Sequence, residues 1–187
     1  MHRIASTFLL LLLLGQQARA QTALDLKNLQ TEATNCLQRK DAKAAQAAAD
    51  KSLVVAEQLY GNTSEKFSQA LDFAARIYVN LRQPALAENC IVRIVNIIKQ
   101  MKGPHDPMVA QEQASLAEFY ANQGDLVKAE SAYRVAVDVV DGSDQYVRHD
   151  VMPGLLNGLA KVLRAENKFG EASNVDDQAQ KLRDHRI

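Results

Sequence analysis

The chain of 187 residues has few of the features that mark an enzyme, a membrane protein or a nucleic-acid-binding protein. It contains two cysteines, and only 5% of its residues are aromatic. Its 22 basic residues are balanced by 22 acidic ones, which argues against nucleic acid as the main partner. It has no Gly-x-Ser-x-Gly motif, no glycine-rich phosphate loop and no cysteine beside a histidine. We therefore predict a protein that is not an enzyme and that needs no cofactor.

The histidines and cysteines do not predict a metal site or a disulfide. His105 and His149 each precede an aspartate in connections after the fourth and sixth predicted helices, but a zinc site needs a third ligand and a closer spacing. Cys36 and Cys90 fall on the first and fourth predicted helices, which are not neighbours in a stacked array. Because a disulfide requires Cα atoms within about 7 Å, we expect two buried thiols and no bound metal.

Long apolar runs are absent except at the N-terminus. There, Arg3 precedes an uninterrupted apolar run over residues 8–14, and residues 18–20 (Ala-Arg-Ala) have the small-x-small form of a cleavage site. Even residues 4–14 are shorter than the roughly 20 that a membrane-spanning helix needs, which argues against an uncleaved anchor. We predict that residues 1–20 are a signal peptide and that the protein is exported, to the periplasm or out of the cell.

Removal of the signal peptide would leave a mature chain that begins at Gln21. Arg3 and Arg19 would be lost with the peptide, leaving 20 basic and 22 acidic residues and a net charge of −2. No later apolar run is long enough to span a bilayer, so we expect no membrane span in the mature chain.

The mature chain is built from one repeated pattern of small and aromatic residues. Its clearest copy is LAEFYANQGDLVKAESAYRVA, residues 116–136, in which Ala117 is followed by Tyr120, Gly124, Ala129 and Tyr133. Steps of 42, 42 and 43 residues relate the reference alanines Ala33, Ala75, Ala117 and Ala160. Four repeats, at about 24–61, 64–103, 107–142 and 146–184, therefore account for nearly all of residues 21–187.

The spacing within each repeat predicts two antiparallel helices. Small side chains allow the helices to approach closely, and large neighbours fill the remaining volume. Local signals fix the ends, with Asp41, Asp106 and Asp125 as N-caps and Gly103 as a stop. Pro153 would either delay the start of the seventh helix or kink it. The expected helices are 22–39, 42–60, 64–81, 84–102, 107–123, 126–141, 146–166 and 168–184.

This pattern resembles the tetratricopeptide repeat (TPR). Gln113, Leu116, Ala117, Tyr120, Ala129 and Tyr133 meet the family pattern, with Gln in place of Trp and Ala in place of Gly. The longer period and the segments GPHDPMVA and LLNGLAKVL are similar to the extended repeats of kinesin light chain. The resemblance implies an all-α fold, a right-handed α-solenoid of four helix pairs, which binds peptides or protein surfaces and has no catalytic activity.

The resemblance also implies a concave groove lined by the first helix of each pair. Carried over to this chain, the lining residues are Gln30, Thr34, Asp72, Arg76, Ala114, Glu118, Asn157 and Lys161, with Asn80 and Asn122 one turn further along. Two interpretations are open. The charged residues form a series of opposite charges that stiffens the groove, or the groove binds a partner, with the asparagines holding an extended peptide backbone.

The predicted function is that of an exported scaffold or adaptor that binds a protein or peptide through this groove. One alternative is a self-assembly module that stacks through its terminal repeats. A less favoured alternative is an enzyme subunit whose site has no recognisable motif.

Overall fold

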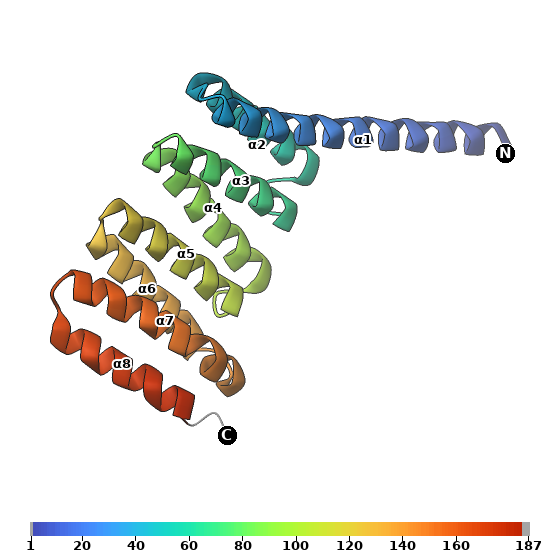
Figure 1. The fold of residues 1–187 in the computed structure, drawn as a ribbon. Coiled ribbons are helices and arrows are strands. Elements are labelled where there is room, and N and C mark those ends of the chain that lie inside the picture. Colours follow the sequence, from blue (N-terminus) through green and yellow to red (C-terminus); the bar gives the residue numbers. More distant parts are fainter. Residues whose placement is uncertain (1, 185–187) are drawn as a thin grey trace. The chain divides into compact units, whose positions relative to one another are not determined.

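The computed structural model describes the backbone of residues 2–184 and the side chains of residues 16 and 19–184. Over this part of the chain there are eight helices and no strand, which confirms the predicted all-α fold (Figure 1). The helices are α1 (His2–Gln38), α2 (Ala42–Tyr60), α3 (Glu65–Asn80), α4 (Pro84–Lys102), α5 (Pro107–Gln123), α6 (Leu126–Asp141), α7 (Gln145–Ala165) and α8 (Phe169–Asp184).

Seven of these described helices begin and end within about a residue of their predicted limits, but α1 does not. It begins at His2, well before the expected start near residue 22. The sequence between these points contains no proline and is rich in leucine, alanine and glutamine, which are good helix formers, so nothing in it ends a helix. Most side chains of the predicted signal peptide lie outside the described residues.

Proline at position 153 lies inside α7, and the helix begins before it, at Gln145. Of the two alternatives considered for Pro153, a delayed start is therefore excluded, and the helix begins within a residue of its predicted limit. Asp144 explains the early start, because its side chain accepts a hydrogen bond from the backbone N–H of Val147 at 3.0 Å. Pro153 itself lacks the N–H that would bond to the carbonyl of His149 one turn earlier.

The predicted caps form as expected. Asp41 accepts from the N–H of Ala44 at 3.0 Å, and Asp125 accepts from the N–H of Lys128 at 3.1 Å. Asp106 accepts from the N–H of Met108 at 2.9 Å, directly before the proline that begins α5.

Each helix pair turns through a residue in the left-handed backbone region. These residues occupy the same position of the repeat, seven after the reference alanine, and are Lys40 (φ 63°), Arg82 (φ 57°), Gly124 (φ 81°) and Asn167 (φ 63°). The left-handed backbone conformation recurs at this position although the residue type changes. The repeat seen in the sequence is therefore also a repeat of the backbone conformation.

The chain divides into two compact units, Met1–Ala87 and Glu88–Ile187, with the division inside α4. In the first unit, α2 packs on α1 and α3, and α1 also contacts α3. In the second unit, α5 pairs with α6 and α7 pairs with α8, while α7 also contacts both α5 and α6. The predicted small residues are all buried: Ala33, Ala45, Ala75, Ala87, Ala117, Ala129, Ala160 and Ala172.

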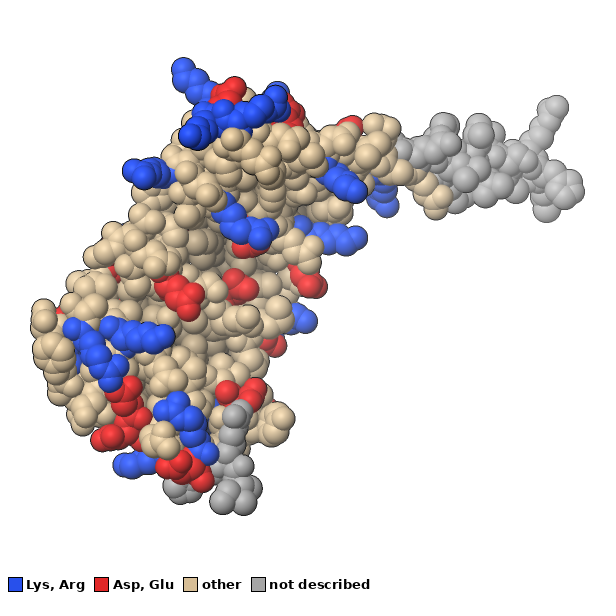
Figure 2. Space-filling model, viewed as in Figure 1, with Lys and Arg blue, Asp and Glu red and all other residues tan. Residues whose placement is uncertain are grey.

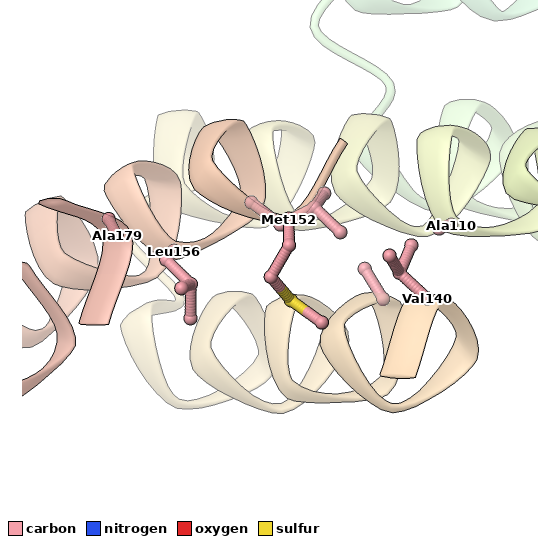
Figure 3. Packing of buried hydrophobic residues seen from close by; sticks show 7 residues of the cluster. Ala110, Val140, Met152, Leu156 and Ala179 are labelled. Carbon is pink, nitrogen blue, oxygen red and sulfur yellow. The ribbon is translucent and has the colours of Figure 1, made fainter. Parts of the chain in front are cut away.

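The core of the second unit is formed by apolar side chains from all four of the helices α5 to α8. Met152 and Leu156 of α7 lie between Val140 of α6, Ala110 of α5 and Ala179 of α8 (Figure 3). Burial of this surface holds the two helix pairs together, since each pair alone would expose an apolar face.

Candidate functional site

A cavity of about 760 Å³ opens in the second unit between α5 and α7. It lies on the side of the first helices of the third and fourth repeats, where the groove is predicted. Its lining residues are Pro107, Met108, Gln111, Ala114, Glu118, Ala121 and Asn122 of α5 or its start, Tyr133 of α6, and Val151, Gly154, Leu155, Asn157, Gly158, Lys161 and Val162 of α7. The volume falls in the range of 300–1,000 Å³ that is usual for ligand sites.

The groove residues predicted for the second unit come together in this cavity. Glu118 and Asn122 lie on α5, and Asn157 and Lys161 lie on α7. The carboxylate and the ammonium occupy equivalent positions of consecutive repeats, each directly after the reference alanine. The α5 wall therefore has a carboxylate and two side-chain amides, including Gln111, and the α7 wall has an ammonium and one side-chain amide.

The charged groove residues differ between the two units in how they pair. Asp72 and Arg76 pair with each other within α3, at 3.1 Å, and both are well exposed. Within the described part of the chain, neither Glu118 nor Lys161 has an ion-pair partner, although both line the same cavity. Charges one helical turn apart pair locally, as Asp72 and Arg76 do, whereas Glu118 and Lys161 stand on different helices of the second unit and are not paired with each other.

The three predicted asparagines differ in their surroundings. The amide of Asn80 donates to the backbone carbonyl of Arg76 at 2.7 Å, so it folds back on its own helix. Asn157 accepts from Arg183 Nη1 at 3.4 Å. Asn122 is exposed in the cavity and makes no hydrogen bond to the described part of the chain. Asn122 and Asn157 are therefore better placed for a ligand than Asn80.

The first unit has a smaller cavity at the equivalent place. Its volume is about 330 Å³, and it is lined by Leu26, Gln30, Tyr60, Lys66, Gln69, Ala70, Phe73 and Arg76. Of the residues predicted to line the groove here, Gln30 and Arg76 do so, whereas Thr34, Asp72 and Asn80 are not among the lining residues.

Tyr133 lines the second-unit cavity, and the sequence did not identify it as a site residue. Its side chain is almost fully buried, with 6% of the residue exposed. Gly158 makes room for the ring, since a Cβ at that position would lie 2.4 Å from Cε1 and 2.6 Å from the hydroxyl oxygen. Burial and the charge of Glu118 raise the pKa of the Tyr133 hydroxyl, so it stays protonated.

The other two buried tyrosines, Tyr78 and Tyr120, donate to carboxylates inside the protein. Tyr78 bonds to Asp50 at 2.5 Å, and Tyr120 bonds to Glu88 at 2.7 Å. Burial, with the hydrogen bond and charge of Glu88, raises the pKa of Tyr120 to about 12. Tyr133, by contrast, has no hydrogen-bond partner among the described residues.

A polar contact between repeats recurs one residue after the small alanine of each second helix. Gln46 accepts from Gln83 at 2.7 Å, and Glu88 accepts from Lys128 at 3.3 Å as well as from Tyr120. Glu130 accepts from Lys168 at 2.6 Å and from Arg134 at 2.7 Å. These three residues, at intervals of 42, join each repeat to the next within its own unit.

The contact at Glu130 is the most strongly ionic. Lys168 first, and then Arg134, hold the pKa of this carboxyl at about 2, although burial raises it. Arg134 also pairs with Glu171 at 3.1 Å, and Lys168 pairs with Glu166 at 3.0 Å. Basic and acidic side chains are interspersed over this end of the second unit on the face shown in Figure 2.

Within the described residues, no group of three or more histidine, cysteine or carboxylate side chains could hold a metal ion. No helix in this part of the chain has the length and hydropathy of a membrane span. Cys36 and Cys90 are buried, and neither is in a disulfide. His105 lies against Gly142, and His149 is part of α7, which corrects its predicted place in a connection.

Comparison of the sequence with family models and with curated proteins gave no match. The structure does resemble solved structures. BtubC (BKLC) from P. vanneervenii superimposes with a TM-score of 0.64 and 18% identity, over 84% of this chain and 63% of BtubC. This chain thus covers less than two thirds of the length of BtubC.

Two further structures match at lower similarity. MamA has a TM-score of 0.51 at 12% identity, over 87% of this chain and 96% of MamA. A Podosopora anserina protein of the kinesin light chain type, with nearly identical TPR-like repeats, has a TM-score of 0.50 at 13% identity, over 84% of this chain and 93% of its own. These likenesses confirm a TPR-like helical repeat fold.

Proposed function

We propose that this TPR-like repeat protein is an exported, non-catalytic adaptor that binds an extended segment of a partner protein in the groove between α5 and α7. The observation that carries the proposal is the 760 Å³ cavity, which brings Glu118, Asn122, Asn157 and Lys161 together without internal ion pairs for the two charges. Unpaired polar groups on the walls of a half-apolar cavity are typical of a binding site.

The chemistry of the walls favours a polypeptide backbone. An extended backbone presents N–H donors and C=O acceptors to both sides, and a side-chain amide offers a donor and an acceptor together. Asn122 on one wall and Asn157 on the other can each bond to such a backbone. Apolar lining residues such as Met108, Leu155 and Val162 provide surface for the partner's side chains.

The test uses a partner recovered from the native exported fraction with the intact protein as bait. Asn122→Ala combined with Asn157→Ala should weaken the affinity for that partner by about 1–3 kcal/mol, the cost of two lost polar contacts. Isothermal titration calorimetry measures the affinity, and far-UV circular dichroism should show unchanged helix content.

Asn80→Ala is the matched control, because Asn80 occupies the position equivalent to Asn122 but bonds to its own helix. It should leave the affinity almost unchanged. If the double variant binds as tightly as the parent, the groove is not the site. If Asn80→Ala weakens binding as much as the double variant, the site is not confined to the second unit.

Export is part of the proposal, supported by the sequence of residues 1–20. Mass spectrometry of the exported protein should find Gln21 as the first residue. Recovery of chains that still begin at Met1 would contradict cleavage.

A further inference from the structure

The side chain of Tyr133 is largely buried, but its hydroxyl is open to the cavity and has no partner within the described part of the chain. The residue is 6% exposed, yet no hydrogen bond to the described part of the chain satisfies its oxygen. Tyr78 and Tyr120 show how this fold treats a buried hydroxyl, since each donates to a carboxylate of the preceding repeat. The Tyr133 hydroxyl has no such carboxylate and instead faces the cavity, where it can hydrogen-bond to water or to a ligand.

The hydroxyl belongs to the floor of the α5–α7 cavity. Tyr133 lines the cavity, and its ring fits against Gly158, another lining residue, so closely that a Cβ there would collide with it. A Cβ at Gly154, one turn earlier on α7, would meet nothing within 4 Å. The Tyr133 side chain therefore fills the space beside Gly158, whereas the space beside Gly154 is empty.

The charges on the two walls limit what can occupy this place. Glu118 and Lys161 follow the reference alanines of their repeats, so they stand at equivalent levels of neighbouring helices. A cation above Tyr133 would be attracted by Glu118 and repelled by Lys161. An anion would be attracted by Lys161 and repelled by Glu118. An uncharged group with both a donor and an acceptor is compatible with both walls.

We propose that Tyr133 is a specificity-determining residue that hydrogen-bonds, through its hydroxyl, to an uncharged polar side chain of the bound segment, such as serine, threonine, asparagine or glutamine. The inference rests on the proposed function and adds the kind of residue that the groove selects. In an extended segment alternate side chains point to the same side, so one such residue would face the floor while its two neighbours face away.

The first test needs no ligand. Tyr133→Phe removes only the hydroxyl and should leave the midpoint of urea unfolding unchanged or slightly raised, because no internal bond is lost. Tyr120→Phe is the matched control, and it should increase the unfolding equilibrium constant by about fivefold or more, since it removes the bond to Glu88. If Tyr133→Phe destabilises the protein as much as Tyr120→Phe does, the hydroxyl is satisfied internally and the inference is wrong.

The second test is selection from a displayed library of random peptides on the parent and on Tyr133→Phe. The parent should enrich serine, threonine, asparagine or glutamine at one position. The variant should lose that preference and keep the others, and it should bind the parent's best peptide about three- to tenfold more weakly. Alanine at the selected position should make the two proteins bind equally.

The other outcomes contradict the inference in distinguishable ways. Identical profiles for both proteins, or a basic or acidic residue at the selected position, would overturn the role of Tyr133 and leave the groove as a binding site. Apolar anchors at helical spacing would replace the extended segment with a helix and overturn the inference as well. If the parent enriches no peptide, the proposed function fails together with it.

Discussion

The grooves of the two units differ at two equivalent positions. In the second unit Gly154 and Gly158 face a cavity of about 760 Å³. In the first unit Gln69 and Phe73 stand at the same positions of the repeat, and the cavity is about 330 Å³. The backbone pattern of the repeat is shared, so the fold provides the place for a groove, and the larger side chains at these positions leave less space in the first unit.

The units also differ in the contact that joins consecutive repeats. In the first unit the contact is neutral, because Gln46 bonds to Gln83, whose own Oε1 is buried without a partner. In the second unit Glu130 makes charged bonds to Lys168 and Arg134. The unit with the larger groove thus has the stronger connection between repeats, which keeps the groove walls at a fixed separation.

The largest effect on stability is expected at Gly158, where the first unit has Phe73. Gly158→Ala places a Cβ against the buried ring of Tyr133 and should lower the stability of the second unit by about 1–3 kcal/mol. Hydrogen exchange of the α5 to α7 amides measures this change. Gly154→Ala is the control and should raise stability by about 0.5–1 kcal/mol, because its Cβ enters open space in a helix. Equal stability of the Gly158→Ala variant and the parent would contradict this account of the ring packing.

A smaller effect is expected for the dependence of stability on pH at Glu130. The pKa of Glu130 is lowered from 4.5 to about 2 in the folded protein, so its contribution is fully present above pH 4.5 and is lost as the pH falls toward 2. At neutral pH, Glu130→Gln should reduce the stability of the second unit by about 1–2 kcal/mol. The difference between parent and variant, measured by urea unfolding at several pH values, should shrink through this range.

Gln46→Ala tests the neutral contact of the first unit, which has no charge to titrate. The loss of stability caused by this substitution should be the same at pH 2.5 and pH 7. A pH-dependent cost for Gln46→Ala, or a pH-independent one for Glu130→Gln, would show that the two contacts do not differ in the way the structure indicates.

The smallest effect is expected for the exposed pair Asp72 and Arg76. The pair spans one helical turn at the surface, so Asp72→Asn should change stability by no more than about 0.5 kcal/mol, and less in high salt. Thermal unfolding at two salt concentrations checks this. A loss above 1 kcal/mol would mean that this pair has a role in the first unit that its exposure does not suggest.

Most of the fold could be predicted because its signals are local and repeated. The alanine spacing predicted the close helix contacts, and aspartates such as Asp41 and Asp125 marked the helix starts. The sequence left two alternatives open for Pro153, and the Asp144 cap directly before α7 decides against a delayed start, because it outweighs one missing N–H. The α1 helix extends further because no breaker precedes the repeat.

The groove was only partly predictable, since its contents depend on which side chains meet across helices. Glu118 and Lys161 were expected to line it, but whether they pair is decided by the distance between α5 and α7. Tyr133 was taken as a core residue because of its place in the repeat. A signal was available, since the equivalent residue is Ile91, which shows that packing at this position needs no hydroxyl.

The left-handed turns have a consequence for the order in which the chain folds. Lys40 and Arg82 hold their turns in a conformation that costs an L-residue roughly 1–2 kcal/mol, and only Gly124 adopts it freely. A helix pair with a strained turn is disfavoured in isolation and becomes stable once a neighbouring pair covers its apolar face. The pair α5 and α6, which turns at Gly124, is therefore the expected nucleus of the second unit. The pair α7 and α8 would add to it, since its own turn at Asn167 has the weaker local preference.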